Sequence, residues 1–294
     1  MFNRECLVEF IKNMLDDYGF ETCVYDKLCI DISAKGKKDL LFIKILYNID
    51  SFQKNQAIGM KIMSSVLDAK AFLIGYRTRF EFLKDEIMYE RFDVPTMTPK
   101  TFEMILNYKY PRIQRDRGGL YGVIDPIKLK NARKRKGLTR IKLAKLVGTT
   151  KKNIYDHERR EFRASTELIE KLEKVLSENI QKVEIKRKSE ESLPKRNDKI
   201  ARLFERIGFW ASRIEKAPFD IIIKKNFVAF AEVDIEENKI HMLKTFSDFV
   251  EEPAFIITKN KETKINVEIP IIDINYLKTE VKGPNDLKRL ILKI

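Results

Sequence analysis

The chain has 294 residues, of which 44% are hydrophobic and 35% are charged, and its formal net charge is +14. A chain of this length can bury about two domain cores, and no apolar run reaches the roughly 18 residues needed to cross a bilayer, which argues against membrane-spanning helices. The N-terminal stretch MFNRECLVEFIKNML carries acidic residues and no long apolar block, unlike a secretory signal peptide. We therefore expect a cytoplasmic protein.

Cysteine and histidine are scarce. Cys6, Cys23 and Cys29 are odd in number and lie near one end of the chain, far from His157 and His241. This spacing fits neither a disulfide framework nor a four-ligand zinc site. We expect reduced thiols in the core, and neither a bound metal nor a cofactor.

The first third of the chain predicts an α/β domain. The apolar spacing indicates a helix, three short strands, a second helix and a further strand. The helices are expected near 3–17 and 53–68, and the strands around 22–25, 28–33, 39–46 and 70–75.

The middle third predicts four short helices. Apolar residues recur there at helical spacing in four blocks, formed by Leu129 and Ala132, by Leu143, Ala144 and Val147, by Ile154, and by Leu168, Ile169, Leu172 and Leu176. Gly137 ends the first block and Gly148 allows a tight turn after the second, while Thr139 and Thr150 are placed to cap the second and third helices. A helix, a short turn and a second helix with polar residues at its start is the layout that places a recognition helix in the major groove of DNA.

This segment resembles the Cro/repressor-type (XRE) helix-turn-helix. The family skeleton GLTxxxLAxxxGxxxxxIxxxE matches GLTRIKLAKLVGTTKKNIYDHE, residues 137–158, at every fixed position. The resemblance implies contacts with DNA bases from Thr150, Lys151, Lys152, Asn153 and Asp156, and positions near phosphates for Arg133, Arg140 and Arg159. Arg160 and Ala164 replace the glycine and the proline that often follow the third helix of the family, so the turn at this point is not predicted.

Positive charge is concentrated around this module. Residues 111–198 hold 25 lysines and arginines against 13 acidic residues, whereas the flanks are nearly neutral, with 16 against 16 in residues 1–110 and 17 against 15 in residues 199–294. A local field of this sign favours a polyanionic partner. Part of the excess lies in KVEIKRKSEESLPKRNDK, residues 182–199, whose composition also suits a charged linker without a ligand.

The last third of the chain repeats the first. Residues 16–46 align with residues 204–235, so that Asp31 falls on Asp220. Two further matches, AFLI with AFII and VPTM with IPII, follow in the same order. The common order predicts two copies of one α/β fold on either side of the helical module.

The order of elements in each copy resembles the restriction-endonuclease-like fold, in which a strand-borne aspartate and a later Glu-x-Lys hold Mg²⁺ and activate water. The first copy has Asp31 and Lys44, but Phe42 stands where the second carboxylate belongs. One carboxylate cannot hold the metal as two would. We interpret Asp31, like Asp220 in the second copy, as a strand-end aspartate bonded to nearby amides.

The second copy is incomplete in a different way. It offers Asp220 and Glu232, but Asp234 stands where the lysine belongs. Glu232 and Asp234 are expected to share one face of a strand, which leaves weak cation binding open.

Over its full length the chain resembles an archaeal family of HTH-type transcriptional regulators, through LLFIKILYNIDSF, AKAFLIGYRT, YERFDVPTMTPKTFE, RGGLYGVID and the helix-turn-helix. We predict degenerate nuclease-like α/β domains at residues 1–110 and 199–294, a helical XRE-type domain at 111–180 and a charged linker at 181–198.

The interpretation we favour is a sequence-specific, double-stranded DNA-binding transcriptional regulator without catalytic activity, whose flanks serve dimerisation or effector sensing. Repressor-type modules read paired half-sites, so we expect a homodimer. Two alternatives stay open, a low-specificity chromatin- or repair-associated DNA binder and a metal-dependent nuclease that uses the C-terminal domain. The sequence names neither the operator nor the effector.

Overall fold

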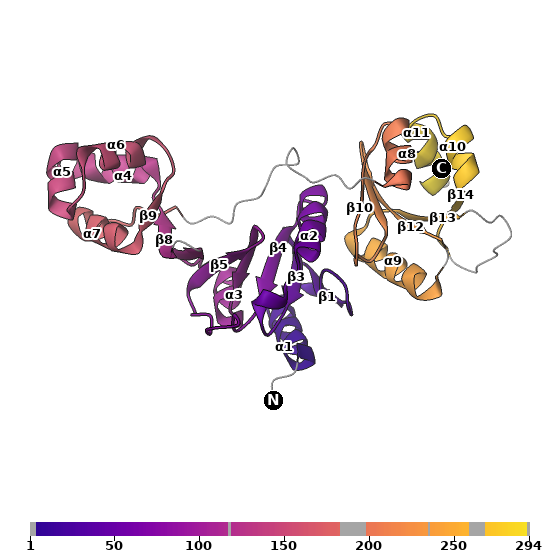
Figure 1. Ribbon diagram of the computed structural model, residues 1–294, viewed down its shortest axis with the longest axis horizontal. Helices are drawn as coiled ribbons and strands as arrows, with labels where there is room; N and C mark the ends of the chain where they lie inside the picture. Colours follow the sequence, from indigo (N-terminus) through magenta and orange to yellow (C-terminus); the bar gives the residue numbers. More distant parts are fainter. Residues whose placement is uncertain (1–3, 117–118, 183–197, 235, 259–267, 293–294) are drawn as a thin grey trace. The chain divides into compact units, whose positions relative to one another are not determined.

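The computed structural model describes residues 4–116, 119–182, 198–234, 236–258 and 268–292. The chain is mixed α/β and divides into two compact units, one formed by Met1–Leu73 with Arg187–Ile294 and the other by Ile74–Lys186 (Figure 1). No helix within the described ranges is long and apolar enough to cross a membrane. Most of the segment predicted as a linker, residues 183–197 of 181–198, lies outside the described residues.

The N-terminal part of the first unit confirms most of the predicted elements. They are α1 (Arg4–Asp17), β1 (Glu21–Val24), β2 (Ile32–Lys35), β3 (Leu40–Ile45), the 3-10 helix η1 (Ile49–Ser51), α2 (Lys54–Val66) and β4 (Lys70–Ile74). The strands lie in the order β1-β2-β3-β4, and β1, β2 and β3 are antiparallel. Helix α1 buries Leu7, Ile11 and Leu15, which recur at helical spacing on one face.

The strand predicted at 28–33 was wrong in its start, because β2 begins only at Ile32. The preceding residues form a loop. A hydrogen bond of 2.8 Å from the Tyr25 amide to the Asp31 carbonyl joins its two ends. Lys27 takes a left-handed conformation with φ of 57° inside this loop, which no regular strand allows. The apolar residues of the loop are nevertheless buried, so their hydrophobicity gave a strand signal.

The C-terminal part of the first unit, the predicted second copy, begins with the same order of helices and strands and continues with further elements. They are α8 (Lys199–Ile207), β10 (Trp210–Arg213), β11 (Ile221–Lys224), β12 (Val228–Val233), α9 (Glu237–Val250), β13 (Ala254–Thr258), β14 (Ile271–Asp273), α10 (Ile274–Thr279) and α11 (Pro284–Leu292). The strands lie in the order β10-β11-β12-β13-β14, antiparallel from β10 to β12 and parallel from β12 to β14. Figure 1 shows α9 on one face of this sheet and α8, α10 and α11 on the other. The alternating residues Ile221 and Ile223 face the second group of helices and form a core with Phe204 and Leu287.

The two copies share backbone hydrogen bonds as well as element order. Three bonds around the aspartates correspond, from Tyr25 N to Asp31 O, Asp31 N to Ile43 O and Ile45 N to Asp31 Oδ2 in the first copy, and from Ile214 N to Asp220 O, Asp220 N to Ala231 O and Val233 N to Asp220 Oδ2 in the second. The ladders agree, since Ile32 pairs with Ile43 and Ile221 with Ala231. Lys44 and Glu232 therefore occupy equivalent positions.

Aromatic side chains join the two copies inside the first unit. The Phe246 ring of α9 lies 6.2 Å from the Tyr25 ring and 6.1 Å from the Phe42 ring, between ring centroids, and it also contacts Phe219 and Phe230. Pairs of aromatic rings at such separations add to the free energy gained by burial. Phe42 thus packs against the other copy.

The three cysteines are free, as predicted, but only Cys29 lies in the core. Cys6 is exposed and Cys23 is half-buried, so the prediction of core thiols was wrong for these two. Cys6 lies on α1 just before Leu7, where the helical repeat turns its side chain away from the buried face.

The second unit carries a small sheet and the four predicted helices of the middle third. Its elements are β5 (Ile87–Arg91), β6 (Val94–Met97), α3 (Pro99–Leu106), β7 (Ile113–Asp116), β8 (Gly119–Val123), α4 (Pro126–Arg135), α5 (Arg140–Val147), α6 (Lys151–Arg159), β9 (Arg163–Ser165) and α7 (Thr166–Leu176). The strands lie in the order β6-β5-β7-β8-β9. The predicted apolar blocks form one core, in which Leu129, Leu143, Ile154 and Leu172 are fully buried.

Candidate nucleic-acid interface

Local capping fixes the helix-turn-helix as the sequence predicts. The Thr139 hydroxyl accepts from the Lys142 amide at 3.2 Å and begins α5, and the Thr150 hydroxyl accepts from the Asn153 amide at 3.1 Å and begins α6. Each bond satisfies one of the backbone amides that have no partner inside the helix. Gly148 ends α5 in the left-handed region with φ of 73°, which glycine adopts without a steric penalty.

Helix α6 has one buried and one exposed face. Ile154, His157 and Glu158 are buried. Lys151 and Lys152, in the first turn of the helix, are exposed and make no ion pair within the described ranges. Cations at the first turn oppose the helix dipole, so these lysines do not stabilise the helix that carries them.

The remaining residues predicted to contact bases lie at the start of α6 and in its second turn. Thr150 is exposed, and Asn153 and Asp156 are half-buried. The Oδ1 atom of Asn153 is buried and accepts no hydrogen bond from the described residues. The structure thus brings Thr150, Lys151, Lys152, Asn153 and Asp156 together on one helix.

The buried carboxylate of Glu158 links α6 to two neighbouring helices. Glu158 accepts hydrogen bonds from the Arg133 guanidinium of α4, and its Oε2 accepts from Arg140 Nε of α5 at 2.7 Å. Burial opposes ionisation of Glu158, but the hydrogen bonds from the two arginines outweigh it and hold the pKa of the carboxyl below its ordinary value. One side chain therefore fixes three helices. Sequence reasoning missed this role, although the fixed glutamate that closes the family skeleton was the signal for it.

The arginines predicted near phosphates differ in their surroundings. The Arg133 side chain is only 10% exposed, and its Nη1 also donates to the Leu138 carbonyl at 2.7 Å. These contacts count against the predicted phosphate position of Arg133, because its guanidinium already has internal partners. Arg140 is 35% exposed and lies over the Tyr155 ring, and Arg159 is exposed without an ion pair in the described part of the chain.

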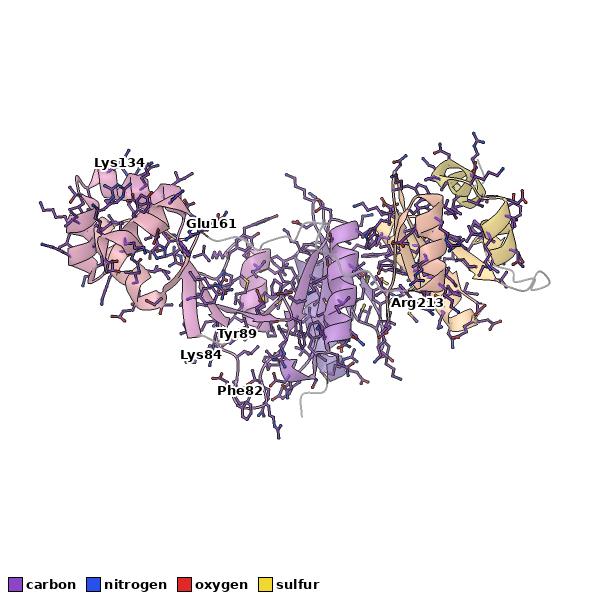
Figure 2. All side chains as sticks on the ribbon, turned by 45° about the horizontal axis from the view of Figure 1, so that its top comes forward. Phe82, Lys84, Tyr89, Lys134, Glu161 and Arg213 are labelled. Carbon is purple, nitrogen blue, oxygen red and sulfur yellow. The ribbon has the colours of Figure 1, made fainter. Side chains whose placement is uncertain are left out.

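The turn after α6 explains the two departures from the family skeleton. Arg160 is extended, with φ of −150° and ψ of 159°, so the position does not need glycine. Its guanidinium lies 4.2 Å from the centroid of the Phe162 ring, which His157 contacts edge-on. Ala164 then enters β9 and pairs with Gly122 of β8. Figure 2 shows Glu161 in this connection and Lys134 on α4.

In the nuclease-like first copy, the carboxylate of Asp31 is paired with two basic side chains. Asp31 is fully buried, and its Oδ1 accepts from Lys44 Nζ at 2.9 Å and from Arg4. Lys44 Nζ donates in turn to the Leu28 carbonyl at 2.7 Å. Asp31 also accepts from the Ile45 amide, as interpreted from the sequence, so an amide and two charged side chains share this carboxylate.

In the second copy, Glu232 and Asp234 do not lie on one strand as predicted. Glu232 occupies the position of Lys44, whereas Asp234 is exposed beyond the end of β12 in a left-handed conformation with φ of 69°. The expectation that Glu232 and Asp234 share a strand face was therefore wrong. Across the described ranges, no group of three or more His, Cys, Asp or Glu side chains could hold a metal.

Glu232 has an unusual environment. Its side chain is 2% exposed, Lys239 Nζ of α9 lies 3.5 Å from its Oε1, and Asp220 is beside it. Burial, and then the neighbouring Asp220 charge, raise the pKa of Glu232 to about 8. Asp220 itself contacts Arg213 Nη2 at 3.4 Å.

Comparison with known proteins gives two family matches within the chain. Residues 4–111 match the family model described as a PD-(D/E)XK superfamily domain, and residues 129–183 match the helix-turn-helix model. No solved structure matches the chain.

Relatives named "Putative HTH-type transcriptional regulatory protein" are similar over most of the chain. One from Methanothermobacter thermautotrophicus is 34% identical over 76% of this chain and 72% of its own length. Two from Pyrococcus horikoshii and Pyrococcus furiosus are 30% and 29% identical, over 98% and 99% of this chain and 97% and 98% of their own lengths.

Proposed function

The chain belongs to this archaeal family of HTH-type transcriptional regulatory proteins, and from that premise we propose that it is a cytoplasmic, sequence-specific regulator that binds double-stranded DNA through α6. The exposed cations at the start of α6 carry the proposal. They lie where the helix dipole disfavours them, on a helix that Ile154 and Glu158 fix to the core. Helices of this kind read bases with the residues of their first turns.

We assign base contacts to Thr150, Lys151, Lys152, Asn153 and Asp156, with Arg140 and Arg159 near phosphates. Lysine can donate to O6 and N7 of guanine, and asparagine can pair with N6 and N7 of adenine. Arg133 takes a different role in this proposal, that of holding Glu158 and so the angle between α4 and α6. Phosphate contacts then set the position of the protein on DNA, while base contacts set its sequence preference.

We further propose that both flanks are copies of the restriction-endonuclease-like fold without nuclease activity, and that they serve dimerisation or effector sensing. The three corresponding hydrogen bonds around Asp31 and Asp220, two between backbone groups and one from an amide to the carboxylate, support the repeat. The ion pair of Asp31 with Lys44 and Arg4 supports the absence of catalysis by the first copy, because a metal would have to displace both cations. A homodimer would present two recognition helices to paired half-sites.

The test is selection of bound duplexes from a random pool, followed by footprinting of the enriched sequence. A sequence-specific dimer enriches a discrete palindrome and protects it from cleavage. A low-specificity chromatin- or repair-associated protein would enrich no sequence and protect no discrete site, and this result would reject the proposal in favour of that alternative.

A further inference from the structure

The loop of residues 76–84, between β4 and β5, exposes aromatic side chains that the proposed function does not use. It carries Phe80, which is 88% exposed, and Phe82, which is 64% exposed. Figure 2 shows Phe82 at the outer end of this loop, with Lys84 and Tyr89 closer to the sheet. Two neighbouring phenylalanines exposed to this degree contribute little to the core, and exposed apolar groups gathered in one place mark sites of interaction.

The loop is held in one conformation by its own hydrogen bonds. The Thr78 hydroxyl accepts from the amides of Phe80 and Glu81 at 3.2 and 3.0 Å, and the Thr78 amide donates to the Glu81 carbonyl at 2.8 Å. The Arg77 guanidinium donates to the Thr78 and Arg79 carbonyls at 2.9 and 3.1 Å. The two rings are thus presented by a fixed turn, and little conformational entropy is lost when they bind.

The base of the loop is also fixed. The Leu83 amide donates to the Tyr76 carbonyl at 2.8 Å, the Leu83 side chain is buried, and the Lys84 amide donates to the Tyr89 hydroxyl at 2.9 Å. The backbone at the base of the loop is therefore held in place by hydrogen bonds as well as by burial of Leu83.

Cations surround the exposed rings. The guanidinium carbons of Arg77 and Arg79 lie 5.4 Å and 6.0 Å from the centroids of the Phe82 and Phe80 rings. The single acidic residue of the loop, Glu81, is paired with Arg115 at 2.7 Å. Arg77 and Lys84 therefore give the loop positive charge, which would be left without a counter-ion in an apolar pocket of another protein and is complementary to a phosphate backbone.

We propose that this loop is a second DNA contact, in which Phe80 and Phe82 enter between base pairs of bound duplex while Arg77 and Lys84 meet phosphates. Apolar side chains that enter a duplex in this way unstack a base step and bend the DNA by roughly 20–90°. The inference rests on the proposed function only in taking double-stranded DNA as the ligand. It adds bending to an interface that otherwise reads the major groove alone.

The experiment measures DNA bending by energy transfer between dyes on the two ends of a duplex, for an enriched and for a scrambled sequence. The wild type is expected to bend the bound duplex, and the double variant Phe80→Ala, Phe82→Ala to lose most of that bend. The variant Phe80→Leu, Phe82→Leu should keep it, because leucine can also enter a base step. Ile127→Ala, which removes an exposed side chain of α4, is the matched control and should bend DNA as the wild type does.

Sequence preference on the same duplexes separates this inference from the proposed function. The alanine variant should keep the preference for the enriched duplex, whereas Lys152→Ala should weaken the preference and keep the bend. The inference is overturned if the wild type bends no bound duplex, if the alanine variant bends it equally, or if that variant loses self-association in sedimentation instead of bending.

Discussion

The carboxylate of Glu158 offers the sharpest test of how the recognition helix is held. In Glu158→Gln the side chain keeps its size but loses the charge shared by Arg133 and Arg140. The Glu158 and Arg133 side chains are 2% and 10% exposed, so the substitution leaves a buried guanidinium without its counter-ion. Removing one partner of a buried ion pair costs about 3–5 kcal/mol. We expect about 3 kcal/mol, the lower end, because the Arg140 side chain is 35% exposed and water compensates it in part.

Hydrogen exchange of the α6 amides measures this loss in the intact chain. A loss of about 3 kcal/mol corresponds to exchange more than about 100-fold faster, since 1.4 kcal/mol is a factor of ten. The pH dependence adds a second readout. The folded-state pKa of Glu158 is lowered, so its contribution to stability is present above the ordinary carboxyl pKa and is lost as the pH falls through the folded value. The wild type should lose protection on acidification over this window, and the variant should not.

Glu178→Gln is the matched control, because Glu178 pairs with Arg135 on the same domain but at an exposed position. It should leave exchange in α6 nearly unchanged. If Glu158→Gln exchanged like this control, the carboxylate would not be what fixes α6, and the assignment of Arg133 as a positioning residue would be wrong.

Three further predictions concern the flanks. Sedimentation should show at least a dimer, since paired recognition helices gain from being linked, and a protein that stays monomeric with and without DNA would contradict the proposed role of the flanks. The pKa of Glu232 is raised to about 8, so the folded protein holds this proton more tightly than the unfolded chain does. The resulting contribution to the free energy of unfolding is fully present below the ordinary carboxyl pKa and is lost as the pH rises through 8. Urea unfolding of Glu232→Gln should lack that loss, and a variant with the same pH dependence as the wild type would refute the assignment. Incubation with Mg²⁺ or Mn²⁺ should leave DNA uncut, whereas cleavage that Asp220→Ala abolishes would establish the nuclease alternative.

The helix-turn-helix could be predicted closely because its signals are local. Thr139, Gly148 and Thr150 act within a few residues of their own positions, so their capping and turn roles follow from the sequence alone. The buried role of Arg133 could not be predicted in this way. Its partner Glu158 is 25 residues away, and only the packing of α4 against α6 brings them together.

The second flank shows why strand alignment was harder. The sequence alignment put Glu232 at the position of Phe42. The strand pairing in the structure puts it at the position of Lys44, so the alignment was wrong by two residues. A shift of two keeps every side chain on the same face of the sheet, so the alternating apolar pattern cannot detect it. The hydrogen bonds of Asp31 and Asp220 settle the register where the pattern does not.

The exposed loop was missed for a different reason. RTRFEF, residues 77–82, alternates charged and aromatic residues and resembles a half-buried strand. Whether those rings face a core or solvent depends on the turn that Thr78 closes, which the alternation does not reveal.

The most direct test of the central claim is titration of wild type, Lys152→Ala, Asn153→Ala and Arg159→Ala against an enriched and a scrambled duplex at several salt concentrations. Loss of a base contact should cost roughly 1–3 kcal/mol on the enriched duplex and much less on the scrambled one. Arg159→Ala should instead weaken binding to both duplexes alike and lower the salt slope by about 1, the value for one phosphate contact. Equal losses on both duplexes for Lys152→Ala and Asn153→Ala would contradict the account, because α6 would then bind DNA without reading its sequence.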